Sequence, residues 1–157
     1  RHVAAPRSRG DRARRQAARL ALAASGLLAP SAAAAQTLVF DGDVPTTDGV
    51  AYFEIPFEVP AGVAEIEVRH DDLSAMNILD WGLLSPSGFR GYGGGNTESA
   101  VINAEAATRS YLAGAIEPGT WQVYVGEANV EELPARYHVE VELRATATLA
   151  PQPARAP

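Results

Sequence analysis

Apolar and polar residues alternate along most of the chain after position 37, with a spacing of two rather than the 3.6 residues of a helix. Successive side chains of a β-strand point to opposite faces, so each alternating segment predicts a half-buried antiparallel strand. The five clearest segments are residues 51–59, 64–70, 79–84, 121–126 and 136–144. Shorter candidates are residues 38–40, 99–103 and 111–113.

Turn-forming residues separate these segments. Proline, glycine or both occur at residues 60–62, 85–88, 118–119 and 133–134. About seven or eight short strands, with no amphipathic helix of about 12 residues among them, predict an all-β fold. The expected architecture is an antiparallel β-sandwich, such as a jelly roll.

The alternation also predicts which large side chains fill the core between the two sheets. We expect them to be Phe53, Phe57, Trp81, Trp121 and Tyr137. Proline cannot donate a hydrogen bond within a sheet. Because Pro56 interrupts an otherwise regular strand pattern, we expect that strand to lie at a sheet edge or to carry a bulge.

Charge is unevenly distributed along the 157 residues, whose formal net charge is -6. Residues 1–35 carry seven Arg and one Asp, whereas residues 36–157 carry six Arg and 18 acidic residues. An acidic body repels phosphate and anionic lipid, so we expect no nucleic-acid partner. The chain has no Cys, which excludes disulfides, cysteine nucleophiles and thiolate metal sites. It also has no Lys and only three His.

The first 35 residues have the pattern of a secretory signal peptide. An Arg-rich stretch precedes an apolar run at residues 20–28, Pro30 ends that run, and Ala33 and Ala35 form a small-residue cleavage motif. The run is about half as long as the roughly 20 residues that span a bilayer, so we expect no membrane span after cleavage. The alternative is a disordered leader rich in Ala and Arg.

This pattern predicts three parts: a signal peptide at residues 1–35, a β-sandwich at 36–148 and a Pro-rich linker at 149–157. The mature protein would be periplasmic or extracellular, exported by the general or the twin-arginine route. The sequence begins with Arg rather than Met and ends in a linker. We therefore expect a fragment that lacks a downstream domain.

Three carboxylates lie close together at Asp41, Asp43 and Asp48. Ca²⁺ prefers hard oxygen ligands, so these are weak calcium candidates. The spacing fails to match an EF-hand loop, because Pro45 and Thr46 take the fifth and sixth places and no Glu closes the loop. A solvated turn is the stronger interpretation.

A second cluster contains His70, Asp71, Asp72 and Asp80. A catalytic zinc or iron site needs about three protein ligands brought together, and one His beside acids does not complete that set. His138 could add a ligand only if the fold placed it nearby. We therefore expect His70 to be a solvent-exposed partner of the acids.

The Gly-rich segment at residues 88–96 does not match a phosphate-binding loop. It contains no Gly-Lys-Ser/Thr, and the G-x-G-x-x-G spacing from Gly91 fails at Asn96. We expect a long mobile loop whose Phe89, Arg90 and Tyr92 form the best candidate recognition surface. The Ser residues show no triad pattern, so no catalytic residue is assigned.

Three segments carry a resemblance to a known family. They are the run Leu-Asp-Trp-Gly-Leu-Leu-Ser-Pro-Ser-Gly-Phe-Arg-Gly-Tyr-Gly-Gly-Gly at 79–95, the stretch 109–126 with its Tyr-Leu-Ala-Gly and Pro-Gly-Thr-Trp motifs, and residues 137–143. Together they resemble the amino-terminal domain of PHP (polymerase and histidinol phosphatase) metal-dependent hydrolases, in the CehA/McbA-like branch. The likeness covers about residues 38–144.

This resemblance implies a non-catalytic accessory sandwich of an exported PHP-type phosphoesterase or hydrolase. In that family the catalytic domain follows, opens with a Gly-Asp-x-His-x-His run and holds divalent metal ions. The present sequence contains no His-x-His, so no catalytic residue of the family can be assigned to it. The expected partner is the downstream catalytic domain of the same polypeptide, and whether the full-length protein is an enzyme stays open.

The Pro-Ala-Gly and Pro-Gly-Thr turns, together with Leu-Asp-x-x-Leu, are also similar to the secreted pre-peptidase carboxy-terminal sandwich, a non-catalytic module whose fold is the alternative to a jelly roll for this chain. The alternative function is therefore a self-contained secreted binding module. It would bind carbohydrate or a protein partner through the segment at residues 85–96.

Overall fold

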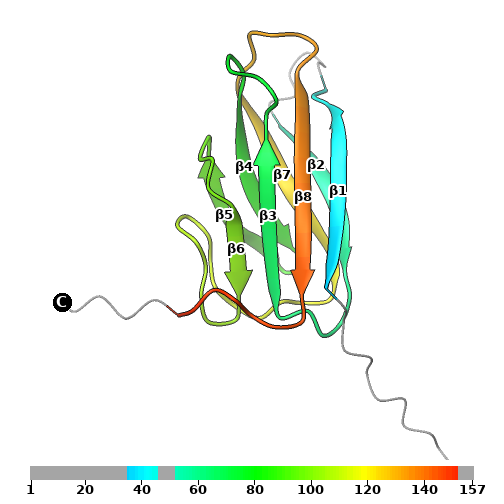
Figure 1. Ribbon diagram of the computed structural model, residues 1–157, viewed down its shortest axis with the longest axis vertical. Coiled ribbons are helices and arrows are strands. Elements are labelled where there is room, and N and C mark those ends of the chain that lie inside the picture. The colour runs from blue at the N-terminus through cyan, green and yellow to red at the C-terminus, as the bar shows by residue number, and fades with distance from the viewer. Residues whose placement is uncertain (1–34, 46–51, 152–157) are drawn as a thin grey trace, which may run out of the picture.

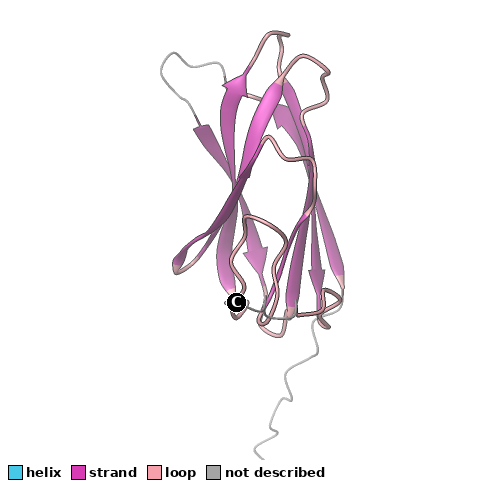
Figure 2. Ribbon diagram, turned by 90° about the vertical axis from the view of Figure 1, so that its left-hand side faces the viewer, coloured by secondary structure: helices cyan, strands magenta, loops and turns pink. Residues whose placement is uncertain are grey.

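The computed structural model describes residues 35–45 and 52–151. They form two four-stranded antiparallel sheets that face each other, as Figures 1 and 2 show. This confirms the all-β sandwich predicted from the sequence. The strands are β1 (Gln36–Asp43), β2 (Tyr52–Val59), β3 (Glu65–Asp71), β4 (Ile78–Ser85), β5 (Gly88–Gly94), β6 (Ala100–Asn103), β7 (Gly119–Asn129) and β8 (Arg136–Arg144).

The strand order is that of a jelly roll. One sheet has the order β1-β8-β3-β6 and the other β2-β7-β4-β5. The first strand therefore pairs with the last, the second with the seventh, the third with the sixth and the fourth with the fifth. Such nested pairing is a long hairpin rolled into two layers, with further pairs of β3 with β8 and β4 with β7 that complete the sheets.

The core contains the side chains that the alternation predicted. Trp121, Trp81 and Phe57 are buried between the sheets. Phe53 and Tyr137 are partly buried and pack on each other with ring centroids 5.3 Å apart. Every one of the five predicted core side chains therefore contacts or belongs to the core.

Strand β2 lies at a sheet edge, as Pro56 predicted. Its register with β7 runs without a break from Tyr52 opposite Gly126 to Val59 opposite Gly119. The edge position alone therefore accommodates the proline, because its missing N–H can face away from β7.

Two predictions about local structure were wrong. The Gly-rich segment is not a long loop, because residues 88–94 form strand β5 in a tight hairpin with β4. Residues 111–113 are not a strand, although Tyr111 forms a single bridge with Gly91. A Cβ atom on Gly91 would lie 2.5 Å from the carbonyl oxygen of Ser110, so a glycine lets this segment cross β5 closely.

The leader prediction falls almost entirely outside the described residues, since the described part begins at Ala35. The same holds for residues 152–157 of the predicted linker. Within the part of the chain that the structure describes, no helix is long and apolar enough to cross a membrane.

Candidate functional site

Aromatic side chains gather on the outward face of the β2-β7-β4-β5 sheet. Alternation sends the odd-numbered residues of β2, β4 and β7 into the core, so the even-numbered residues point outward. Strand β5 adds two more exposed rings to this surface. We call this surface the aromatic face and define it by Tyr52, Leu84, Phe89, Tyr92 and Tyr124.

The three tyrosines of the aromatic face contact each other across the strands. Tyr52 stacks on Tyr124 with ring centroids 4.9 Å apart, and Tyr92 meets Tyr124 edge to face at 5.9 Å. Tyr92 packs directly over Gly82, where an added Cβ atom would lie 2.7 Å from the ring carbon Cδ2. The absence of a side chain at position 82 therefore gives the Tyr92 ring its place on the sheet.

A hydrogen bond fixes the orientation of Tyr92. Its hydroxyl donates to Oδ2 of Asp80 at 2.8 Å. Burial raises the pKa of Tyr92, and the hydrogen bond and negative charge of Asp80 raise it further. The phenol therefore stays protonated and keeps donating to the carboxylate across the physiological pH range.

The aromatic face carries an open hollow of about 450 Å³, lined by Leu84, Phe89, Tyr92 and Tyr124. Phe89 is the most exposed of these, at 60%. All four lining side chains are apolar or aromatic. The volume falls within the range of about 300 to 1,000 Å³ typical of small-ligand sites.

Polar side chains lie beside this hollow on the same sheet face, along β2 and β7. Gln122 donates to Glu54 at 2.6 Å, and Thr120 donates to Glu58 at 2.6 Å. Both pairs are exposed, so their remaining donors and acceptors can reach a ligand. The arrangement can therefore pack a flat apolar surface and hydrogen-bond hydroxyl groups at its edge.

A β-bulge brings Phe89 and Tyr92 to the same face. Residues three apart on a regular strand point to opposite faces. In β5 the register shifts, because Leu83 pairs with Gly91 whereas Leu84 pairs with Phe89. The extra residue in this step is Arg90, and it reverses the alternation so that both aromatic rings point outward.

The third predicted recognition residue, Arg90, points away from the aromatic face and is only 8% exposed. Its guanidinium lies 5.0 Å from the centre of the Trp121 ring. It also donates hydrogen bonds to the carbonyl oxygens of Leu112, Gly114 and Ala115. Arg90 therefore ties the 112–115 segment to the sandwich, and its guanidinium is not part of the exposed surface.

The calcium candidates Asp41 and Asp43 both point outward from β1. Asp41 lies 2.7 Å from Nδ1 of His138, and Asp43 lies 3.7 Å from Arg136. Asp48 lies outside the described residues, so the calcium site stays a prediction. Within residues 35–45 and 52–151, no group of three or more His, Cys, Asp or Glu residues is arranged to hold a metal ion.

The second predicted cluster is not assembled. His70 points inward and stacks on Trp81 of the facing sheet, with ring centroids 4.5 Å apart. Burial lowers its pKa, although a hydrogen bond to the Glu98 backbone and the charges of Asp72 and Asp71 oppose that shift. Asp80 points outward toward Tyr92. The expectation that His70 is solvent-exposed was wrong, because its aromatic ring fills space beside Trp81.

The outward face of the β1-β8-β3-β6 sheet carries paired charges. We call this surface the charged face and define it by Glu67, Arg69, Glu140, Glu142 and Arg144. Arg69 contacts Glu140 at 2.9 Å and Glu142 at 3.2 Å. Arg144 contacts Glu142 at 2.8 Å and also pairs with Glu67. Both arginines are therefore neutralised within the face itself.

A buried carboxylate, Glu65, lies next to the charged face. It is fully buried and pairs with Arg144 at 2.9 Å. Burial alone would raise its pKa, but hydrogen bonds from Thr148, Asn103 and Leu149 outweigh that effect and lower the pKa to about 2. Glu65 thereby fastens the segment after β8 to the sheet.

Sequence reasoning missed Tyr52, Tyr124 and Leu84 as site residues. The signal was nevertheless present, because Tyr52 and Tyr124 occupy polar positions of their alternating strands. A large aromatic ring on the solvent side of a strand is a candidate contact residue. Only the strand order, which places β2 beside β7, shows that the two rings meet.

No protein-family model matches the chain, and no curated protein matches it either. The resemblance to PHP hydrolases therefore stays a prediction.

Proposed function

We propose that this chain is a non-catalytic binding module whose aromatic face binds neutral carbohydrate. The observation that carries the proposal is the position of the Tyr92 ring. It packs over Gly82, its hydroxyl donates a hydrogen bond to Asp80, and it lies beside the exposed Phe89. A ring held in this way is a preorganised contact surface, which lowers the entropy lost on binding.

The chemistry of the aromatic face suits a sugar ring. The C–H face of a pyranose is apolar and packs on an aromatic ring, while its hydroxyls need donors and acceptors at the edge. Tyr92 and Phe89 provide the first kind of surface, and Glu54 and Gln122 provide the second. Lectin domains use jelly rolls as well, which is an analogy of fold only.

Charge favours an uncharged ligand over an anionic one. None of the four residues that line the hollow is basic, and the nearby polar pairs contain the carboxylates of Glu54 and Glu58. Sulfated or uronic glycans would be repelled by this negative potential. We therefore expect neutral oligosaccharides to bind and their sulfated forms to bind much more weakly.

The test is calorimetric titration of neutral glucan, mannan, xylan and chitin hexasaccharides, with a sulfated glucan as comparison. We expect at least one neutral ligand to bind, and Tyr92→Ala or Phe89→Ala to raise its Kd about tenfold or more. The matched control is Leu133→Ala, which removes an exposed apolar side chain at another end of the sandwich. Equal binding by all variants, or no binding of any neutral glycan, would overturn the proposal.

The same module would serve as the accessory domain of an exported PHP-type hydrolase, where it would hold the enzyme on its substrate. This second proposal depends on the residues at 79–95 and 109–126 that carry the resemblance. Its test is the gene sequence beyond Pro157. A Gly-Asp-x-His-x-His run there would support it, and a stop codon or an unrelated domain would overturn it.

A further inference from the structure

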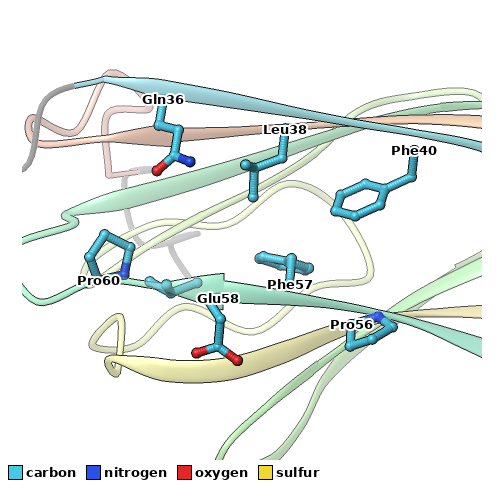
Figure 3. Close-up of a pocket in the computed structure, with 8 residues that line it drawn as sticks. Gln36, Leu38, Phe40, Pro56, Phe57, Glu58 and Pro60 are labelled. Atoms are coloured by element: carbon cyan, nitrogen blue, oxygen red, sulfur yellow. The ribbon is translucent and has the colours of Figure 1, made fainter.

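A second hollow lies between the two sheets, on the side where β1 and β2 face each other. Figure 3 shows Leu38 and Phe40 of β1 pointing toward the strand that carries Phe57. The hollow measures about 610 Å³. Its lining residues are Gln36, Leu38, Phe40, Pro56, Phe57, Glu58, Val59 and Pro60. We call it the seam groove, and it shares no lining residue with the aromatic face.

Both strands that border the seam groove are edge strands. Strand β1 pairs with β8 on one side, and no other described strand pairs with its second edge. In an antiparallel pair, about half of the N–H and C=O groups of an edge strand point away from its partner. Among residues 35–45 and 52–151, no strand therefore pairs with the outward-pointing donors and acceptors of β1, which lie beside an apolar groove.

The two edges differ in their ability to accept a further strand. Pro56 lies in the middle of β2 and cannot donate to a ladder. Strand β1 contains no proline, and its charged residues, Asp41 and Asp43, both lie in its last three positions, so residues 36–40 carry no charge that would oppose a further strand. The strand that can be extended is therefore β1.

We propose that the seam groove binds an extended peptide that adds to β1 as a further strand. Alternate apolar side chains of the peptide would enter the groove between Leu38 and Phe40 on one wall and Phe57 on the other. The peptide backbone would pair with the free edge of β1. This is recognition by strand addition, in which main-chain bonds provide affinity and the groove provides specificity.

The charges around the groove indicate which residues the peptide should carry at the alternate positions that point away from the groove. Asp41 and Asp43 point outward from β1 and stay 59% and 74% exposed, although Asp41 contacts His138 and Asp43 contacts Arg136, both on β8. Glu58 lies on the β2 rim, and no basic residue lines the groove. Residues of the peptide that point outward would lie beside these carboxylates, where opposite charges stabilise a cross-strand pair. The ligand is therefore a peptide that alternates apolar and basic residues.

The test uses a fluorescent octapeptide that alternates Val and Lys. Its comparisons are a peptide of the same composition with four Val followed by four Lys, and an alternating peptide methylated on the backbone nitrogens that would face β1. We expect the alternating peptide alone to bind, and we expect it to protect the amide protons of β1 from exchange. Protection at β6, the other edge of that sheet, should not change.

Two matched variants separate the groove from the surface of the strand. Leu38→Gln places a polar group in the groove and should raise the Kd at least fivefold. Val39→Gln makes the same kind of change at the next residue, whose side chain points outward from the sheet and is 54% exposed. It should change the Kd less than twofold. A melting curve of each variant checks that it is folded.

A surface variant keeps the test valid if Leu38→Gln does not fold. The double variant Asp41→Asn, Asp43→Asn leaves the groove intact and should weaken the Val-Lys peptide about threefold at low salt. Equal binding of the block peptide would overturn the proposal, as would binding without protection of β1. Self-association through β1, seen by sedimentation in the absence of peptide, would assign this edge to a second copy and would also overturn it.

Discussion

The two outward faces of this sandwich differ in how their polar groups are satisfied. On the charged face, Arg69 and Arg144 each contact several glutamates within the face. On the aromatic face, large rings remain exposed, and the polar groups near them form single hydrogen bonds such as that between Gln122 and Glu54. Both faces belong to sheets of the same size and the same jelly roll.

Because of this difference, we expect the charged face to contribute mainly to the stability of the fold and the aromatic face mainly to ligand binding. A face whose charges are already paired offers a ligand little, because binding would have to break those pairs. A face with exposed rings and spare hydrogen-bonding groups gains by covering them. Substitutions on the charged face should therefore lower the free energy of unfolding, and substitutions on the aromatic face should mainly lower affinity.

The largest expected effect is that of Arg144→Met, which removes the cation shared by Glu65, Glu67 and Glu142. We expect a loss of about 3–5 kcal/mol in the free energy of unfolding, because a buried carboxylate loses its partner. Urea denaturation measures it. The control Arg136→Met removes an exposed 3.7 Å contact and should cost less than about 1 kcal/mol. Equal losses would show that the charged face does not stabilise the fold.

The next largest effect is a loss of folding stability at low pH, when Glu65 becomes protonated. Folding lowers the pKa of Glu65 from 4.5 to about 2, so the folded state binds this proton less readily than the unfolded state does. The resulting stability is fully present above about pH 5 and is lost as the pH falls toward 2, with an upper value of about 3 kcal/mol. Stability curves of the wild type and of Glu65→Gln measure it. The difference between them should shrink over that window, and a constant difference would contradict the expectation.

A smaller effect on stability and a larger one on binding are expected from Gly82→Ala. The new Cβ atom would lie 2.7 Å from Tyr92, so the ring must move. We expect a stability loss of about 1 kcal/mol from overpacking, with carbohydrate affinity lowered about tenfold. Tyr92→Phe is the milder comparison, since it keeps the ring and removes only the hydrogen bond to Asp80. Unchanged affinity in Gly82→Ala would mean that the position of the ring does not matter.

The smallest effect is expected from His138, a half-buried member of the β1–β8 pair. The hydrogen bond with Asp41 raises its pKa, with a further contribution from Glu140. The stabilisation is therefore present below about pH 6.5 and is lost as the pH rises through the higher folded-state pKa. We expect less than about 1 kcal/mol, measured as the difference between the melting curves of the wild type and His138→Gln at pH 6 and pH 8. Taking this difference cancels the opposite dependence of His70.

The sequence predicted most of the fold, because period-two alternation is strong wherever apolar residues mark one face. Strand β8 shows this best, since Val139, Val141 and Leu143, which alternate with polar residues in the segment predicted at 136–144, are all buried. Strand β5 was missed because four of its seven residues are glycines, which carry no hydrophobic signal. Its strand character comes from pairing with β4, a tertiary effect that local composition does not encode.

The candidate site was predicted only in part, and Arg90 shows why. Its exposure depends on a bulge that reverses the alternation within β5, and nothing local in the sequence marks that register shift. Phe89 and Tyr92 were identified as candidates and are exposed. Their neighbours Tyr52 and Tyr124 join them through strand order, which links residues far apart in the chain.

The nested strand pairing also governs when the sandwich can form during synthesis. Asp41 and His138, which meet across the first and last strands, are 97 positions apart. A growing chain can close the β4–β5 hairpin early, but β1 has no partner until β8 has been made. The sheet that contains β1 can therefore be completed only after β8 has been made, and its long-range contacts make folding slow.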